Sequence, residues 1–212
     1  MTKGLFVTFE GGEGAGKSTL ARRLQDALKG LSREVLLTRE PGGTTFSEEV
    51  RNLVLHHKGQ VTNRAELFLF LSARIQHIEE LIKPALARGA IVLCDRFNDS
   101  SIAYQGEARG LGMDYVASCC ALATSAFQPD ITFFIDLDPK LGMLRTHKRR
   151  SHTKEAVDRL ENEALHFHEK VRLGFQKLAL ANPNRIITID GTLSADEVFT
   201  IAYEKIKQHL VL

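Results

Sequence analysis

Gly11-Gly12-Glu13-Gly14-Ala15-Gly16-Lys17-Ser18 is the stretch that decides the fold of this chain. It fits the phosphate-binding pattern Gly-x4-Gly-Lys-Ser/Thr. The apolar residues 5–10 before it suit a buried strand, and residues 19–29 after it carry apolar side chains at helical spacing. A strand, a glycine-rich loop and a helix are the context in which this motif holds triphosphates on backbone N–H groups. The motif predicts that Lys17 reaches the β and γ phosphates and that the Ser18 hydroxyl binds Mg²⁺.

The composition is that of an ordinary globular protein and narrows the class of partner. The 212 residues suit one domain over residues 1–212, with 43% hydrophobic and 25% charged residues. A net charge of +2 gives no overall bias toward nucleic acid. The three cysteines lack metal-ligand spacing, which favours buried free thiols in a reducing cytosol. No signal peptide and no run of transmembrane length is recognisable, so we expect a cytoplasmic protein without a membrane partner.

Apolar segments alternate with helical patterns along the whole chain. We expect strands at residues 5–10, 34–38, 90–94, 131–136 and 185–190. We expect helices at residues 19–29, 47–57, 65–88 (kinked near Pro84) and 195–209, shorter helices and loops within 98–127, and two helices interrupted by a polar basic stretch within 139–182. This order predicts an α/β fold, a five-stranded parallel sheet with helices on both faces. Ligands of such sheets bind beyond the carboxyl ends of the strands.

An acid and an arginine follow the third predicted strand. Asp95 ends the apolar run, where a P-loop enzyme places a second acid near the magnesium ion held by Ser18. The alternative is that Asp95 caps a helix or lies in a loop. Arg96 has the planar fork that suits a phosphate, and its alternative is a salt bridge with Glu10 or Asp95.

The stretch Arg145-Thr146-His147-Lys148-Arg149-Arg150 is the strongest cluster of charge in the sequence. It could be a solvated helix face, a nucleic-acid patch, or a lid whose arginines close over transferring phosphates. Aromatic residues do not interleave the cluster and the net charge is near neutral, which disfavours nucleic acid. We favour the lid, because a P-loop that carries no arginine needs such a cation from elsewhere.

Aromatic and polar residues in two further segments are candidates for contact with a base. Phe70 and Arg74 lie four residues apart on the helix predicted over 65–88 and share a face, whereas Phe68 and Leu69 are expected in the core. Spacing alone makes Phe70 a core residue as readily as a ligand. The segment of residues 100–106 could contact the edges of a base or sugar, and from spacing alone this signal is weak.

At this point the residues resemble one family, the bacterial thymidylate kinases of the nucleoside-monophosphate-kinase group. The matching motifs come in family order and cover nearly the whole chain: residues 9–19, 38–44, Phe70 with Ala73-Arg74, 95–97, 100–101, 103–106, 129–130 and 158–161. The resemblance implies a P-loop fold with an acceptor-binding region at about 39–106 and a short basic lid at about 145–157. We expect Asp158 to open the helix that follows the lid.

The resemblance implies an activity and a set of ligands. The γ-phosphoryl group of ATP would pass to dTMP, giving dTDP and ADP for dTTP synthesis, with Mg²⁺ as cofactor and no nucleic-acid partner. It assigns the ATP phosphates to Gly11, Gly12, Glu13, Gly14, Ala15, Gly16, Lys17, Ser18 and Thr19, and the metal to Ser18 and Asp95. It assigns dTMP to Glu13, Glu40, Arg51, Phe70, Arg74, Arg96, Ser101, Tyr104 and Gln105.

Within that acceptor set, the resemblance gives separate roles to the sugar, base and phosphate contacts. Glu13 would accept a hydrogen bond from the 3′-hydroxyl, and Tyr104 would crowd the 2′ position. Phe70 would stack on thymine and Arg74 would bind its exocyclic oxygen. Ser101 and Gln105 would contact the base edge, and Arg96 would bind the acceptor phosphate. Glu40 and Arg51 would complete the acceptor site.

Family members differ in where the catalytic arginine lies. Ala15 in the loop and the basic stretch at 145–150 are typical of members whose lid supplies it. Catalysis would then fall to Lys17, Arg96 and a lid arginine, with Arg145, Arg149 and Arg150 as unranked candidates. The resemblance also suggests a homodimer, with the helix over residues 65–83 as a candidate contact.

Overall fold

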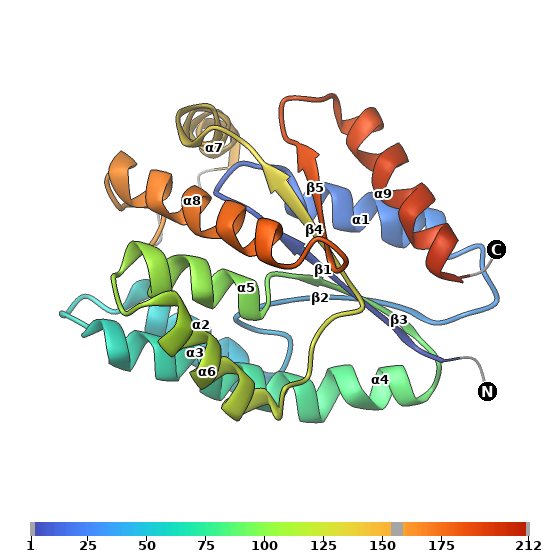
Figure 1. Cartoon of the computed structure of the whole chain (residues 1–212), viewed down its shortest axis with the longest axis horizontal. Helices are drawn as coiled ribbons and strands as arrows, with labels where there is room; N and C mark the ends of the chain where they lie inside the picture. The colour runs from blue at the N-terminus through green and yellow to red at the C-terminus, as the bar shows by residue number, and fades with distance from the viewer. Residues whose placement is uncertain (1–2, 154–158, 211–212) are drawn as a thin grey trace.

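The computed structural model describes residues 3–153 and 159–210 and shows a twisted sheet between two layers of helices (Figure 1). The strands are β1 (Leu5–Glu10), β2 (Val35–Arg39), β3 (Ile91–Asp95), β4 (Ile131–Asp136) and β5 (Ile186–Asp190). The α-helices are α1 (Lys17–Leu28), α2 (Thr45–His56), α3 (Asn63–His77), α4 (Lys83–Ala87), α5 (Asn98–Ser101), α6 (Met113–Thr124), α7 (Pro139–Thr153), α8 (Leu165–Ala181) and α9 (Ala195–Leu210). Two π-helical segments are η1 (Ile78–Ile82) and η2 (Ile102–Ala108).

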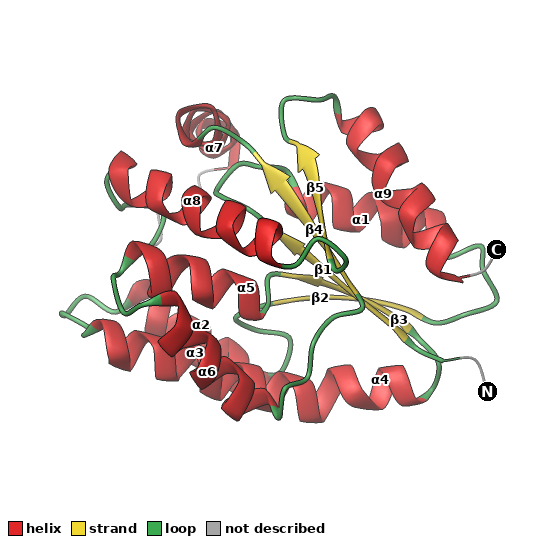
Figure 2. Cartoon of the chain, in the orientation of Figure 1, coloured by secondary structure: helices red, strands yellow, loops and turns green. Residues whose placement is uncertain are grey.

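The sheet has the strand order β2-β3-β1-β4-β5, and every neighbouring pair is parallel, as Figure 2 shows in yellow. The central strand β1 is buried along its whole length, and its Phe9 lies opposite Asp95 of β3 and Phe133 of β4. All carboxyl ends therefore meet at one edge of the sheet, where the loop of residues 11–16 also begins. The predicted five-stranded parallel sheet is confirmed.

Alternate residues of β1 serve the two faces of the sheet. Val7 and Phe9 pack in the cluster that contains Leu24 of α1 and Ala202 of α9, whereas Phe6 packs with Ile82 on the opposite face. The second face is covered by η1, α4 and, further along, by η2, α6 and α8. A parallel sheet buried on both faces needs such continuous apolar strands, which is why the strands were visible in the sequence.

The long helical stretch at residues 63–87 accommodates Pro84 by a change in its hydrogen-bond ladder. The N–H of Lys83 bonds to the carbonyl of Ile78, five residues earlier, at the end of the π-helical turn η1. Proline has no N–H, so a helix that reaches it must lose or shift a bond. The π turn therefore lies directly before Pro84, where we expected a kink.

Two predictions on the segment after β4 are wrong. The basic stretch at 145–150 lies within the single helix α7 and does not interrupt it, because arginine and lysine are good helix formers. The next helix begins at Leu165, and Asp158 lies outside the described residues. Arg159 instead lies in a turn. Its backbone N–H donates to the carbonyl of Leu55 and its Nε donates to the carbonyl of Val54, so the turn is held against the end of α2.

Phe68, which we expected in the core, is exposed, and so is the apolar side chain of Leu53. Phe68 on α3 is 51% exposed and Leu53 on α2 is 50% exposed. The inner face of α3 is already taken by Leu67, Phe70 and Leu71, and Phe68 lies outside that stripe.

Cys94 and Cys120 are buried free thiols as expected, whereas Cys119 is only half-buried. Across the described helices, none combines the length and the apolar character that a membrane span requires.

Candidate active site

The loop at residues 11–16 joins β1 to α1 and turns sharply onto the helix N-terminus. Gly16 precedes α1 with φ 99°, a left-handed conformation that favours glycine. Lys17 begins the helix, and its Nζ donates to the carbonyl oxygens of Gly11 at 3.1 Å and Gly12 at 2.8 Å. The loop N–H groups and the helix dipole thus face the same edge as the strand ends, which is the arrangement that binds phosphates.

Two cavities lie on either side of this loop. The first, which we name the Arg96 cavity, is lined by Glu13, Lys17, Ser18, Arg39, Glu40, Pro41, Arg51, Leu55, Phe70, Arg74, Asp95, Arg96, Ser100, Ser101, Tyr104, Gln105, Arg149, Leu160 and Glu161. The second, the Gly191 cavity, is lined by Gly14, Ala15, Gly16, Thr19, Leu20, Arg23, Arg145, Thr146, Arg149, Gly191, Thr192, Leu193, Ser194, Ala195 and Val198. Arg149 lines both.

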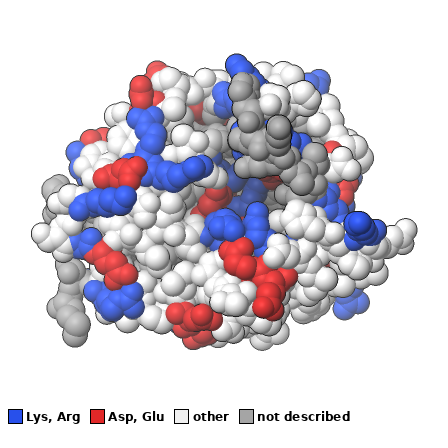
Figure 3. Space-filling view, turned by 180° about the vertical axis from the view of Figure 1, so that it is seen from behind, with Lys and Arg blue, Asp and Glu red and all other residues white. Residues whose placement is uncertain are grey.

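The structure brings most of the predicted site residues together. Every residue predicted to bind the acceptor lines the Arg96 cavity, and so do both predicted metal ligands. Of the predicted ATP-binding residues, Gly11 and Gly12 line neither cavity and meet Lys17 through their carbonyls. On the face shown in Figure 3, Lys and Arg side chains gather around a central recess with acidic side chains beside them.

Glu13, Arg96 and Tyr104 form one hydrogen-bonded group in the Arg96 cavity. Arg96 donates to Glu13 Oε1 at 2.5 Å, and the Tyr104 hydroxyl donates to the same oxygen at 2.9 Å. Burial raises the pKa of the Glu13 carboxyl, but the charges of Arg96 and Lys17 outweigh burial and bring it down to about 2. The Glu13 carboxylate is therefore ionised. The salt-bridge partner of Arg96 is Glu13, and not Glu10 or Asp95, which were the alternatives from sequence.

Ser18 and Asp95 offer oxygen ligands at the entrance of the loop. The Ser18 hydroxyl donates to Asp95 Oδ2 at 2.5 Å. Asp95 Oδ1 is buried and has no hydrogen-bond partner among the described residues. A buried carboxylate oxygen without a partner costs free energy unless a cation or a donor meets it. This set of hard oxygen donors fits Mg²⁺, which prefers oxygen ligands.

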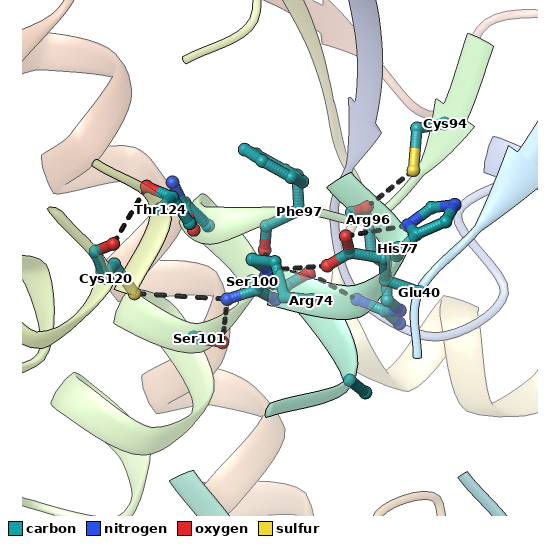
Figure 4. A network of polar contacts seen from close by, with 12 residues as sticks. Glu40, Arg74, His77, Cys94, Arg96, Phe97, Ser100, Ser101, Cys120 and Thr124 are labelled. Atoms are coloured by element: carbon teal, nitrogen blue, oxygen red, sulfur yellow. Dashed lines mark hydrogen bonds and ion pairs between the residues drawn. The ribbon is translucent and has the colours of Figure 1, made fainter. Parts of the chain in front are cut away.

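Arg74 and Glu40 form a buried ion pair, shown in Figure 4. Arg74 Nε donates to Glu40 Oε2 at 2.5 Å, while His77 Nδ1 lies 2.9 Å from Glu40 Oε1. Arg74 also donates to Ser101 Oγ at 3.0 Å. Burial alone would raise the pKa of Glu40, but the Arg74 charge and the His77 contact lower it. These contacts fix the guanidinium at the wall of the Arg96 cavity.

Phe70 belongs both to the core and to the cavity wall. It is 8% exposed and packs with Val50, Val54 and Leu55. The same side chain lines the Arg96 cavity. The two interpretations left open from its spacing are therefore compatible, since the same side chain packs in the core and lines the cavity.

Helix α7 packs directly on the phosphate-binding loop through a glycine. A methyl group built on Gly142 would lie 2.2 Å from the carbonyl oxygen of Glu13. The close approach places Arg145 and Arg149, further along α7, over the loop. Arg145 donates to the carbonyl of Gly191 at 3.0 Å, whereas Arg149 and Arg150 both pair with Glu161, and of these two only Arg149 lines the cavities. The three candidate arginines, equal in sequence, are therefore separated by position.

Sequence reasoning missed Gly142 and the segment of residues 191–195, which lines the Gly191 cavity. A glycine inside a helical pattern costs about 1 kcal/mol relative to alanine, so Gly142 was itself a signal of close backbone contact. The segment of residues 191–195 directly follows β5, and the rule that ligands bind beyond strand ends could have identified it.

Glu10, behind Arg96, gives a pH-dependent prediction. Its fully buried carboxyl accepts from Phe97 N–H at 2.7 Å and from Ser100 Oγ at 2.5 Å. Burial, reinforced by Asp99, raises its pKa from 4.5 to about 8. Its contribution to stability is therefore complete below the unfolded value of 4.5 and is lost as pH rises through about 8.

Glu10→Gln should remove this dependence, because glutamine mimics the neutral acid. We expect the difference between the melting temperatures of the variant and the parent to rise by several degrees between pH 5 and pH 8. Over this range the free energy of unfolding of the parent loses a contribution from Glu10 of the order of a few kcal/mol. Thermal unfolding followed by circular dichroism across that range measures it. Two parallel curves would contradict a raised pKa at Glu10.

The fold and the two cavities define the class of the P-loop nucleotide kinases. A family model described as Thymidylate kinase matches residues 9–201. The thymidylate kinase of Protochlamydia amoebophila is 48% identical over 97% of this chain and 93% of that protein, and that of Shouchella clausii is 44% identical over 100% and 98%. The crystal structure of thymidylate kinase from Ehrlichia chaffeensis is similar at a TM-score of 0.76 and 34% identity, covering 96% of this chain and 99% of that chain. The chain belongs to the thymidylate kinase family, as its motifs predicted.

Proposed function

We infer that this chain transfers the γ-phosphoryl group of ATP to dTMP, giving dTDP and ADP. The observation that carries the inference is the position of the P-loop between two cavities, one of which contains every residue predicted for the acceptor. Arg149 lines both cavities and can act on a group that passes between them. A second candidate activity has no comparable observation in its favour.

The donor occupies the Gly191 cavity in this proposal. Its phosphates lie on the loop at residues 14–19, where Lys17 and the N-terminus of α1 meet them. Its adenine lies between α1 and the segment of residues 191–195, because these elements, together with α7, supply the remaining walls of the cavity. The acceptor then enters from the opposite side of the loop.

The acceptor occupies the Arg96 cavity, with its base deepest. Phe70 offers a ring face for stacking, and Arg74 and Gln105 offer polar atoms to the base edge. Arg96, beside Glu13, binds the acceptor phosphate, and Glu13 is the acceptor for a sugar hydroxyl. The orientation is supported by the order of these residues, since the phosphate-binding groups lie nearest the loop.

Catalysis consists of alignment and charge neutralisation. The oxygen of a monophosphate is already ionised at neutral pH and needs no strong base to attack. Arg96 and Lys17 hold the acceptor and donor phosphates in line, and Arg149 stabilises the charge that develops on the transferring group. Burial and Arg96 lower the pKa of Lys17, while Glu13 raises it.

We further propose that Ser18 and Asp95 hold Mg²⁺, for which their oxygens are suited. When bound, the ion supplies neutralisation of charge on the donor phosphates. A homodimer through α3 is also proposed, supported by the exposed Phe68 and Ile75 on that helix, and sedimentation at equilibrium would test it. The buried thiols of Cys94 and Cys120 support a cytoplasmic location, which fractionation would test.

A panel of acceptors tests the proposed function. With ATP and Mg²⁺, the protein should phosphorylate dTMP with a higher kcat/KM than dCMP, dGMP, dAMP or thymidine. Coupled detection of ADP measures each reaction under one set of conditions. Faster turnover of thymidine would indicate a nucleoside kinase, and faster turnover of another monophosphate would assign a different acceptor to the same fold.

A further inference from the structure

Glu66 on α3 is a fully buried acid that lines neither cavity. Its Oε1 accepts from Gln105 Nε2 at 2.8 Å and from Arg109 Nε at 3.3 Å. Its Oε2 accepts from Arg159 at 2.5 Å and from Arg109 at 3.4 Å. Two guanidinium groups balance the buried charge, so Glu66 is a carboxylate that can only accept hydrogen bonds.

Gln105 connects this buried acid to the Arg96 cavity. It belongs to η2, is 1% exposed, and lines the cavity that Glu66 does not reach. Because the carboxylate of Glu66 cannot donate, the amide must turn its NH₂ group toward Glu66. The carbonyl Oε1 then lies on the other side of the planar amide, and no described donor is hydrogen-bonded to it.

The reverse orientation of the amide is disfavoured by its energy. It would place the Gln105 carbonyl against a carboxylate oxygen and lose a hydrogen bond to a charged group. That loss alone corresponds to roughly a 10- to 100-fold preference for the observed orientation. Glu66 therefore determines which end of the Gln105 amide a ligand meets.

We propose that Glu66 is a positioning residue that sets base selectivity by fixing the Gln105 carbonyl toward the acceptor base. The proposal rests on the function inferred above. Thymine and uracil carry a donor, N3–H, which a carbonyl accepts. Cytosine carries a lone pair at N3, which a carbonyl repels. Arg74, a donor on the same cavity wall, matches the carbonyl oxygen of thymine and not the amino group of cytosine.

Glu66→Gln tests the proposal because the arginines decide how the new amide lies. Arg159 makes the shortest contact to the Oε2 position, so the glutamine oxygen should occupy it and the NH₂ group should replace Oε1. Gln105 must then turn its carbonyl toward residue 66 and its NH₂ group toward the base. The variant should therefore change the preferred base, besides weakening dTMP binding.

We expect the ratio of kcat/KM for dTMP to that for dCMP to fall about 100-fold in Glu66→Gln, mostly through KM. dUMP, which carries the same N3–H, should decline in parallel with dTMP. The ratio compares two acceptors on one preparation and so does not depend on the folded fraction. Arg109→Gln, which removes another partner of Glu66 but keeps the Gln105 bond, is the matched control and should leave the ratio unchanged.

The outcomes test the proposed function and the role of Glu66 separately. If the parent does not prefer dTMP to dCMP, the proposed function fails. If the parent prefers dTMP but Glu66→Gln keeps the same ratio, only the role of Glu66 is overturned. Should Glu66→Gln fail to fold, Gln105→Met retains Glu66 with both arginines and removes the amide. Its dTMP to dCMP ratio must also fall, and an unchanged ratio would overturn the proposal.

Discussion

Arg149→Ala is expected to lose about 10³-fold in kcat while its KM for dTMP changes little. Arg149 is the arginine of α7 that lines both cavities, at the point where a phosphoryl group would pass from donor to acceptor. A cation at that point interacts most strongly with the charge that builds up during transfer. Its loss therefore raises the barrier more than it weakens ground-state binding.

Arg150→Ala is the matched control, one residue further along α7. Its side chain pairs with Glu161, as that of Arg149 also does, but it lines neither cavity, so we expect a change of no more than a few-fold. Arg149→Lys should recover part of the activity, because lysine keeps the charge and loses the planar fork. Steady-state kinetics with both substrates varied gives kcat and each KM. An equal loss in the two alanine variants would mean that helix α7 was disturbed, and Arg149 would lose its assigned role.

Lys17→Ala is expected to lower kcat by about 10³-fold and to leave the fold intact. Lys17 Nζ lies against the loop carbonyls of Gly11 and Gly12, at the N-terminus of α1. No other lysine is found among the residues that line either cavity in the described part of the chain. Its removal therefore takes away a positive charge from the donor phosphates that no neighbouring lysine can replace.

The control for Lys17→Ala is Lys29→Ala, at the other end of the same helix. Lys29 is exposed and pairs with Asp26, so its loss should leave kcat unchanged. Melting temperatures of both variants should lie within a few degrees of the parent, which separates a chemical effect from unfolding. Full activity in Lys17→Ala would refute the assignment of the loop to phosphate binding.

The strands were predictable because each is decided by local sequence. The segments 131–136 and 5–10 are mostly apolar, which is typical of strands buried on both faces. The helix faces were less predictable. Phe68 and Leu53 are large apolar side chains of the kind found in cores, yet both are exposed. Helical spacing gives the relative positions of side chains, but it does not say which stripe of the helix packs against the rest of the protein.

The site was predictable only where a motif carries its own geometry. The loop at 11–18 and the strand-tip residues Asp95 and Arg96 lie where their sequence positions indicate. Glu66 and Gln105 are 39 residues apart, and nothing local to either predicts their hydrogen bond. The contact depends on how α3 and η2 pack, and packing is set by many distant contacts at once.

The loop at residues 11–16 illustrates which features depend on local sequence and which depend on tertiary structure. Its residues alone determined that a phosphate would be bound at the end of β1, because the backbone turn and the helix N-terminus are local features. Only the tertiary structure decided which arginine lines the cavities on both sides of that loop. Gly142 lets α7 touch the loop, and the pitch of that helix then places Arg149 along both cavities and Arg150 outside them, although both pair with Glu161. Those three arginines are equivalent in composition, and a distinction between them exists only once the helix has a fixed place on the loop.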